Sequence, residues 1–180
     1  MHGIIHTELK RYVTTKLGAE QWTKLLEAAG LSNKIYVVGG SYPDAELVAL
    51  VTAGAQATKL PADALLEDFG DFIVPTLLET YRPYIDKRWR TLDLLENTEN
   101  TIHRVVRQRN PGAAPPHLKV TRLSKNEVVI TYASPRKLCA VAKGITRGVA
   151  KHYGERIEIT ELGCMNAGAA VCEIRVRLLN

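Results

Sequence analysis

The sequence contains no apolar run of about 18 residues, the length that a membrane-spanning helix needs. Its first residues pass directly into a polar, helix-like stretch, which is unlike a secretory signal. Cysteine is scarce, since the three cysteines are an odd number and all lie in the last third of the 180 residues. This argues against a disulfide scaffold and is typical of a reducing compartment. These absences predict a cytoplasmic protein that does not engage a membrane.

The sequence also lacks the patterns of nucleic-acid-binding proteins and of enzymes. The net charge is +5, but the basic residues are spread along the chain, and no zinc-finger spacing or RNA-binding aromatic motif accompanies them. We find no Ser-His-Asp, Cys-His or paired-carboxylate arrangement beside a base. His2 and His6 have the spacing of a helical metal pair, but without a third ligand we expect them to face solvent. We therefore expect neither nucleic-acid binding nor catalysis.

Enough hydrophobic residues are present to build a core. They make up 46% of the chain, against 24% charged residues, which indicates an ordered protein of one domain or two tightly joined lobes. Apolar residues recur at helical spacing through the first 110 or so residues. The expected helices carry the apolar positions within residues 5–13, 22–29, 47–51, 65–72 and 92–106, and the last must stop by Pro111.

After Pro116 the apolar period changes from helical to alternating. Two strands are expected on either side of a hairpin turn at residues 124–126, then a helix from Ser134 to about His152, then two more strands. Helices followed by strand, strand, helix, strand, strand predict an α+β fold with a four-stranded antiparallel sheet. We expect a single domain over residues 1–180, with a helical lobe at 1–115 and an α/β lobe at 116–180.

The segment Tyr132-Ala-Ser134-Pro-Arg136 combines groups that bind anions. If the helix begins here, Ser134 is its N-cap, Pro135 suits its first position, and the cation of Arg136 opposes the helix dipole unless an anion is present. Two hydroxyls, a guanidinium and free backbone N–H groups would hold a carboxylate or a phosphate. The alternative is an ordinary capped helix whose arginine points into water. The residue types alone leave both interpretations open.

The following motifs connect this segment to a known family. A helical His103 precedes the loop Pro-Gly-Ala-Ala-Pro-Pro and the Tyr-x-Ser-x-Arg pattern; the chain starts Met-x-Gly-Ile-Ile and contains Ser41-Tyr42, Phe69-Gly70 and a cysteine-bearing C-terminal region. The sequence thus resembles the haem nitric oxide/oxygen-binding (H-NOX) family over nearly its whole length. The resemblance implies a haem b buried between the lobes and His103 as the proximal iron ligand. It also implies that Tyr132, Ser134 and Arg136 hold the propionates and that Pro116 presses on the porphyrin.

The resemblance also suggests which gas is bound. Oxygen-binding members of the family carry a distal tyrosine nine residues after the tyrosine of the propionate motif, and this chain has Val141 there. Bound O2 gains from a distal hydrogen-bond donor, whereas NO and CO need none. The other positions that match the distal wall are apolar: Ile5, Leu9, Ile73, Val74 and Ile145. We expect NO and CO to bind and O2 to be rejected, unless Tyr12 reaches into the pocket.

Signalling is expected to pass to a separate protein. NO weakens the iron bond opposite it, so cleavage of the bond to His103 would let the helical lobe shift against the sheet lobe. The sequence ends at Asn180, directly after the last expected strand. Stand-alone bacterial members of the family resemble sensors that regulate a histidine kinase or a cyclic-di-GMP enzyme, and we expect a partner of this kind acting in trans.

Cys139, Cys164 and Cys172 form a second candidate site. A hairpin would bring Cys164 close to Cys172, and the helix carrying Cys139 packs on the same sheet, which would suit zinc. Some relatives use Cys-His-Cys-Cys with histidine three residues before the middle cysteine, where this chain has Glu161. Zinc held with Glu161 or water, free thiols, and a disulfide or redox role remain open. The competing interpretation of the whole chain is a zinc-stapled or cysteine redox-sensing interaction module without haem.

Overall fold

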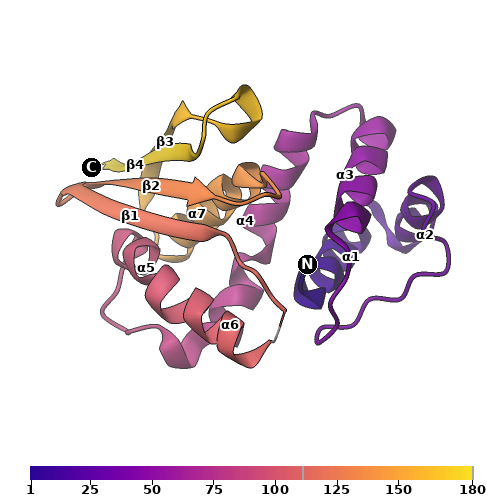
Figure 1. Cartoon of the computed structure of the whole chain (residues 1–180), viewed down its shortest axis with the longest axis horizontal. Helices are drawn as coiled ribbons and strands as arrows, with labels where there is room; N and C mark the ends of the chain where they lie inside the picture. Colours follow the sequence, from indigo (N-terminus) through magenta and orange to yellow (C-terminus); the bar gives the residue numbers. More distant parts are fainter. Residues whose placement is uncertain (111, 180) are drawn as a thin grey trace.

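The computed structural model describes residues 1–110 and 112–179 and has the expected α+β architecture (Figure 1). The helices are α1 (Gly3–Leu17), α2 (Ala19–Ala28), α3 (Asp44–Thr58), α4 (Ala62–Tyr81), α5 (Thr91–Asn97), α6 (Arg104–Arg109) and α7 (Cys139–His152). The strands are β1 (His117–Ser124), β2 (Glu127–Ala133), β3 (Arg156–Gly163) and β4 (Cys172–Leu179). Short turns of other helix types lie at Arg82–Tyr84, Glu99–His103 and Met165–Ala167.

The four strands form one antiparallel sheet in the order β1-β2-β4-β3. Because successive side chains of a strand point to opposite faces, the alternating apolar residues gather on one face. Val128 and Ile130 of β2 and Ile174 and Val176 of β4 are almost completely buried there. They form a core with Leu92 and Leu95 of α5. The expected strands, the hairpin turn and the sheet are confirmed.

The first three helices lie on the opposite side of the molecule from the sheet, with α4 between them (Figure 1). Leu9 and Tyr12 of α1, Trp22 of α2 and Leu47 of α3 share a buried core with Phe69 of α4. A third cluster joins Val74 of α4 to Leu94 and Val149. Hydrophobic cores therefore cross the expected lobe boundary at residues 115 and 116, because α4 and α5 pack against α7 and the sheet.

Helices α4 and α7 are in unusually close contact. A Cβ atom built at Gly144 would lie 2.0 Å from the Glu67 carbonyl oxygen, and one built at Gly70 would lie 2.4 Å from the carbonyl oxygen of Val141. Only glycine lets two helix backbones approach this closely. The close contact fixes the position of α4 on α7, and both helices contribute to the site described below.

Two expected helix boundaries are wrong. The helix after β2 begins at Cys139 rather than Ser134, because residues 134–137 form a turn in which Lys137 has a positive φ of 52° and its N–H donates to the Ser134 carbonyl. The expected helix through residues 92–106 is divided by a π-helical turn at Glu99–His103. Helix α6 ends at Arg109, and Pro111, expected to stop it, lies outside the described residues.

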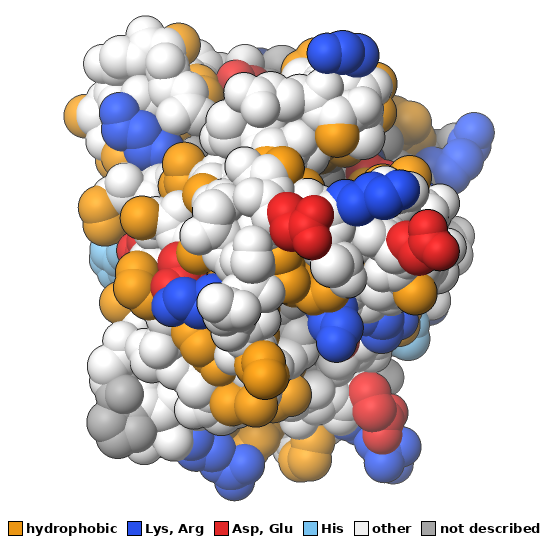
Figure 2. Space-filling model, turned by 90° about the vertical axis from the view of Figure 1, so that its right-hand side faces the viewer, with side chains coloured by type: hydrophobic (Ala, Val, Ile, Leu, Met, Phe, Trp, Pro, Cys, Tyr) orange, Lys and Arg blue, Asp and Glu red, His pale blue; other side chains and the backbone are white. Residues whose placement is uncertain are grey.

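The surface of the helical side carries mixed charge. Figure 2 shows lysine and arginine side chains separated by acidic side chains and by small groups of hydrophobic ones. Hydrophobic side chains that are more than half exposed include Leu17, Ile35, Val37, Val38, Val48 and Leu60. Within residues 1–110 and 112–179, no helix combines the length and the apolar character that crossing a membrane requires.

Candidate functional site

An apolar cavity of about 270 Å³ lies where the first helices, α4, the α5–α6 segment and the sheet lobe meet. This is near the lower end of the usual size of small-molecule pockets, about 300–1,000 Å³. Most of the predicted haem-site residues line it: Ile5, Ile73, Val74, His103, Pro116, Tyr132, Ser134, Arg136, Val141 and Ile145. The fold therefore brings together residues that span 140 positions of the sequence.

Leu9 is an exception among the predicted wall residues. It is buried in the core that α1 shares with α2 and α3 and does not line the cavity. Leu9 lies one helical turn after Ile5, and the neighbouring core residues Tyr12 and Val13 show that this part of α1 faces α2 and α3. The expectation that Leu9 belongs to the distal wall is wrong.

The π-helical turn places His103 on the cavity wall. The backbone N–H of His103 donates to the Thr98 carbonyl at 3.0 Å, a bond that spans five residues instead of four. The hydroxyls of Thr98 and Thr101 donate to carbonyls four residues earlier, at 2.7 and 2.5 Å. Such side-chain bonds compete with the regular ladder, and single π-turns occur often at functional sites.

The imidazole of His103 is almost buried and has an acidic partner. Its Nδ1 lies 2.9 Å from Oε2 of Glu99, and the side chains are 13% and 15% exposed. Burial lowers the pKa of His103 and outweighs the opposing effect of the Glu99 carboxylate. A neutral imidazole whose Nδ1 is engaged has Nε2 available as a ligand atom. The side chain therefore has the charge state that metal coordination requires.

Tyr132, Ser134 and Arg136 form the polar part of the cavity wall. Tyr132 and Ser134 are 3% and 5% exposed, and the Ser134 hydroxyl accepts a bond from the Arg136 backbone N–H at 3.3 Å. The guanidinium Nε of Arg136 donates to Asp44 Oδ2 at 2.8 Å, and its Nη1 donates to the Ala114 carbonyl. Arg136 therefore lies in a turn and not in the first turn of a helix, so the expected conflict with a helix dipole is absent.

The wall around Val141 is apolar, as expected. Ile5, Ile73, Val74 and Ile145 line the cavity with Val141, whereas Tyr12 does not. The Tyr12 hydroxyl donates instead to Asp68 Oδ2 at 2.6 Å, so the proposed alternative donor is engaged elsewhere. Thr146 also lines the cavity, but its hydroxyl donates to the Ala142 carbonyl at 2.9 Å.

Sequence analysis missed three residues of the site. Glu99 contacts His103, Asp44 holds Arg136, and Tyr81 at the end of α4 lines the cavity. The spacing of four between Glu99 and His103 was a usable signal, because residues four apart lie on one helical face. Asp44 and Arg136 are 92 positions apart, and no local pattern joins them.

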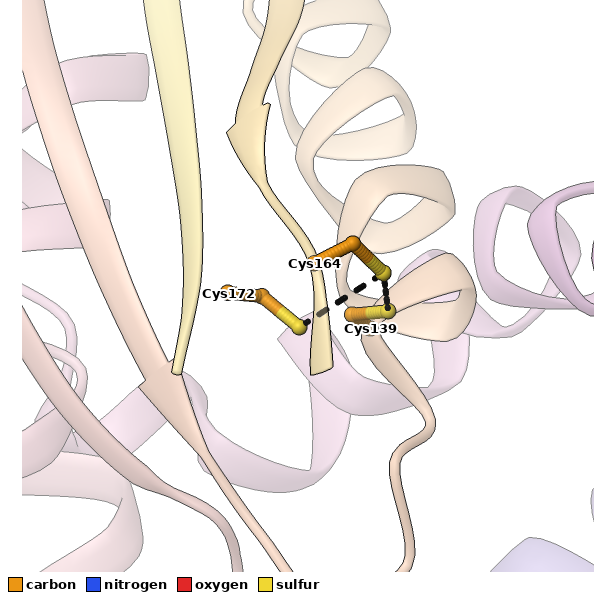
Figure 3. Close-up of side chains that lie close together, drawn as sticks. All are labelled: Cys139, Cys164 and Cys172. Carbon is orange, nitrogen blue, oxygen red and sulfur yellow. Dashed lines mark hydrogen bonds between the residues drawn. The ribbon is translucent and has the colours of Figure 1, made fainter. Parts of the chain in front are cut away.

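The three thiols converge as expected (Figure 3). Sγ of Cys164 lies 3.7 Å from Sγ of Cys139 and 4.0 Å from that of Cys172, and all three lie within 4.8 Å of one another. Burial, helped by the neighbouring thiols, raises the pKa of Cys139. Glu161 is not part of this group, because its Oε2 pairs with Lys143 Nζ at 3.2 Å. The expectation that Glu161 supplies a fourth ligand is wrong.

Known proteins share both the sequence pattern and the fold. The haem-NO-binding family model matches residues 2–161. The crystal structure of an H-NOX protein from S. oneidensis in the Fe(II)NO ligation state is 30% identical, covers all of both chains and superposes with a TM-score of 0.93. The NMR structure of an H-NOX domain from Shewanella oneidensis in the Fe(II)CO ligation state is also 30% identical, over 100% of this chain and 99% of that one, with a TM-score of 0.89.

A curated relative shows that the same domain occurs in larger proteins. A soluble guanylate cyclase, gcy-34, of Caenorhabditis elegans is 26% identical over 158 residues, which are 84% of this chain and 23% of the cyclase. The chain therefore spans less than a quarter of the length of that relative. Because the family model matches most of the sequence and solved H-NOX proteins match the whole fold, this chain belongs to the haem-NO-binding (H-NOX) family.

Proposed function

We propose that this chain is a sensor of NO and CO that holds one haem b in the apolar cavity, with His103 as the axial ligand. The observation that carries the proposal is the placement of one nearly buried neutral histidine and a Tyr132–Ser134–Arg136 group on the wall of a single apolar cavity. A porphyrin needs apolar walls, an iron ligand and partners for two carboxylates. The side chains present here fit all three requirements.

The two polar regions of the wall have separate roles. His103 would hold the iron through Nε2, since Nδ1 is engaged by Glu99. Tyr132, Ser134 and Arg136 would hold the propionates, and Arg136 is the strongest candidate because a guanidinium offers five donors in a planar fork. Pro116 would press on the porphyrin from the loop before β1.

When bound, haem supplies an iron that takes a diatomic gas on the side opposite His103, and NO there weakens the axial bond. The chain selects the gas through the wall around Val141. Apolar side chains give bound O2 no hydrogen bond, while NO and CO lose nothing by the absence of a donor. Tyr81 is the tyrosine of the cavity wall whose hydroxyl needs testing, because it lies two turns beyond Val74 on α4.

Visible spectroscopy of the purified protein tests this proposal. We expect a strong Soret band, stable ferrous NO and CO complexes, and no stable O2 complex in air. The variant His103→Gly should lose haem or take it up only with added imidazole. Normal haem retention and normal ferrous spectra in that variant would exclude His103 as the ligand.

Two further variants test the choice of gas. Val141→Tyr introduces the missing donor and should slow the loss of O2, whereas Val141→Phe has similar bulk without a hydroxyl and serves as the control. If the unmodified protein holds O2, the apolar-wall argument is wrong. Loss of that O2 complex in Tyr81→Phe would then identify Tyr81 as the donor.

The signal would pass to a histidine kinase or a cyclic-di-GMP enzyme acting in trans. This chain corresponds along its full length to a complete solved H-NOX protein chain, which supports a stand-alone sensor without catalytic activity of its own. The test is the activity of the signalling enzyme encoded beside this gene, measured with the unliganded and with the NO-bound sensor. Equal activity with both forms would contradict the assignment of that enzyme as partner.

The cysteine cluster supports a second candidate function, zinc binding or thiol redox sensing. Its three sulfur atoms could coordinate one zinc ion, with water as the fourth ligand. The Met165 backbone N–H donates to Cys172 Sγ at 3.2 Å, a contact that would stabilise a thiolate. Zinc near one per chain, lost in Cys164→Ser together with thermal stability, would establish the zinc site. Three titratable thiols without zinc would favour the redox interpretation, and a missing Soret band would make either one the main function.

A further inference from the structure

Glu99 has more polar partners than any simple ion pair would need. Its Oε2 lies 2.9 Å from Nδ1 of His103 and accepts the backbone N–H of Leu118 at 3.1 Å. Its Oε1 accepts a bond from the Arg107 guanidinium and lies 3.4 Å from Nδ1 of His117. The carboxylate therefore joins the π-helical turn, helix α6 and the first residues of β1.

We infer that Glu99 is a positioning residue for His103: it fixes the ring with Nε2 toward the cavity, strengthens Nε2 as an iron donor and ties the ring to the start of β1. This inference rests on the haem-binding function proposed above. It adds a residue that determines how strongly the axial ligand binds and how a change at that ligand reaches the sheet.

The chemistry of the two side chains supports the first two parts. A neutral imidazole carries one N–H, and an ionised carboxylate can only accept hydrogen bonds. The close contact therefore assigns the proton to Nδ1 and leaves the lone pair on Nε2. A carboxylate that accepts the Nδ1 proton draws it away from the ring and makes the opposite nitrogen a stronger donor. Both side chains are nearly buried, so water screens this effect little.

The shared oxygen supports the third part. Oε2 contacts the His103 ring and the Leu118 N–H together, so a displacement of the ring changes a hydrogen bond at the beginning of β1. Leu118 follows Pro116 by two residues and also lines the cavity. The contact thus links the axial ligand directly to the sheet.

A purely structural role for Glu99 would have a close parallel on the preceding helix. Glu96 of α5 also reaches β1, where Arg122 donates to its Oε1 at 2.9 Å, but no hydrogen bond between Glu96 and His103 is recorded in the described part of the chain. Glu96→Gln is therefore the matched control. It weakens a helix–strand contact without touching the histidine.

The experiment compares Glu99→Gln, Glu99→Ala and Glu96→Gln in the haem-loaded full chain. We expect both Glu99 variants to shift the iron–histidine stretching band of the ferrous protein to lower frequency and to raise the midpoint potential. Haem affinity should fall by about 10- to 100-fold, as for other partners of metal-bound histidines. Glu96→Gln should leave the band and the potential unchanged. An unchanged band in both Glu99 variants, or the same shift in Glu96→Gln, would overturn the inference.

A measurement on haem-free protein keeps this test separate from the proposed function. Nitrogen NMR of the His103 ring should show the proton on Nδ1 in the unmodified chain and a mixture of tautomers in Glu99→Ala. A ring protonated on Nε2 in the unmodified chain would overturn the inference even if haem binds normally. Absence of a Soret band from the unmodified protein would instead overturn the proposed haem function, and the role of Glu99 toward the iron with it.

Discussion

Arg136 already has protein partners on one side of its guanidinium. Its Nε donates to Asp44 at 2.8 Å and its Nη1 donates to the Ala114 carbonyl, so it joins the beginning of α3 to the loop before β1. The side chain is only 15% exposed. A residue in this position contributes to folding as well as to anion binding, which differs from the dipole-based expectation that only a bound anion makes it favourable.

Replacement of Arg136 should therefore affect both the haem-free and the haem-bound protein. We expect Arg136→Ala to lower the free energy of unfolding of the haem-free form by about 1 kcal/mol, the typical value of one ion pair. It should weaken haem retention more than Ser134→Ala, because it removes a charged partner of the propionates. Thermal melts of both variants with and without haem make the comparison. A haem-free Arg136→Ala protein as stable as the unmodified chain would show that the Asp44 contact adds nothing.

His6 is a buried histidine, contrary to the expectation that it faces solvent. It is 0% exposed, its ring stacks on Tyr36 at a centroid distance of 4.4 Å, and neither ring nitrogen has a hydrogen-bond partner among the described residues. Burial lowers the pKa of His6 from 6.5 to about 4, although Glu46 partly opposes this shift. The polar side chain in a helical apolar pattern gave no indication of this.

This burial predicts a loss of stability in acid. The unfolded chain binds a proton at His6 below about pH 6.5 and the folded chain only below about pH 4, so the free energy of unfolding falls as pH decreases between these values. The effect could reach about 3 kcal/mol. His6→Phe keeps the ring stack and removes the titration. Urea unfolding of both proteins from pH 7 to pH 4 should give converging stabilities, and parallel curves would contradict the prediction.

At the level of helices, the contact between α4 and α7 depends on glycine. A Cβ at Gly144 would meet the backbone oxygen of Glu67, which cannot move aside as a flexible side chain can. We expect Gly144→Ala to lower the free energy of unfolding by about 1–3 kcal/mol, the usual cost of overpacking. Gly54 in α3 is the matched control, because a Cβ there would only contact leucine methyl groups at 3.7 and 3.9 Å.

Urea unfolding checks this prediction. Gly54→Ala should be stabilised by about 0.5–1 kcal/mol, because alanine loses less backbone entropy in a helix than glycine does. Gly144→Ala should unfold at lower urea concentration than the unmodified protein. If Gly144→Ala is as stable as Gly54→Ala, then α4 and α7 can separate without cost and their contact is not a rigid part of the fold.

The element boundaries show where sequence patterns are sufficient and where they fail. Alternating residues predicted all four strands, since a half-buried sheet requires that period. The pattern Ser134-Pro135 resembles a helix start, but the chain first makes a turn in which Lys137 takes a positive φ, a conformation that its sequence does not indicate. The π-helical turn at His103 was also not predicted, because inserting one residue into a turn leaves the apolar spacing almost unchanged.

At the level of the whole molecule, the cavity was predictable in composition but not in its polar contacts. The apolar wall, His103 and the Tyr132–Ser134–Arg136 group follow from local motifs and from the family resemblance. The contacts of Arg136 with Asp44 and of Glu99 with Leu118 join segments that meet only after folding. Such long-range pairs have no local signature, and they connect the cavity to the rest of the fold.

The arrangement of the cores predicts which part of the molecule responds to haem. Helices α4 and α7 are packed backbone to backbone, and α7 shares buried residues with the sheet, so these elements should form a rigid unit. The α1–α3 side is joined to this unit around the cavity, whose wall includes Ile4, Ile5 and Leu47. Filling the cavity should therefore stabilise α1, α3 and the segment from α6 to β1 most strongly, because their apolar faces lose contacts when it is empty.

Hydrogen exchange of the haem-free and haem-bound protein measures this difference. We expect haem to slow exchange in α1, in α3 and around His103, while α7 and strands β2 and β4 keep similar protection in both forms. His103→Gly loaded with haem and imidazole is the informative comparison, because it fills the cavity without joining the ligand to the chain. It should restore protection in α1 and α3 but less around residues 99–118. Equal protection there in both proteins would show that filling the cavity, and not the bond to His103, orders this segment.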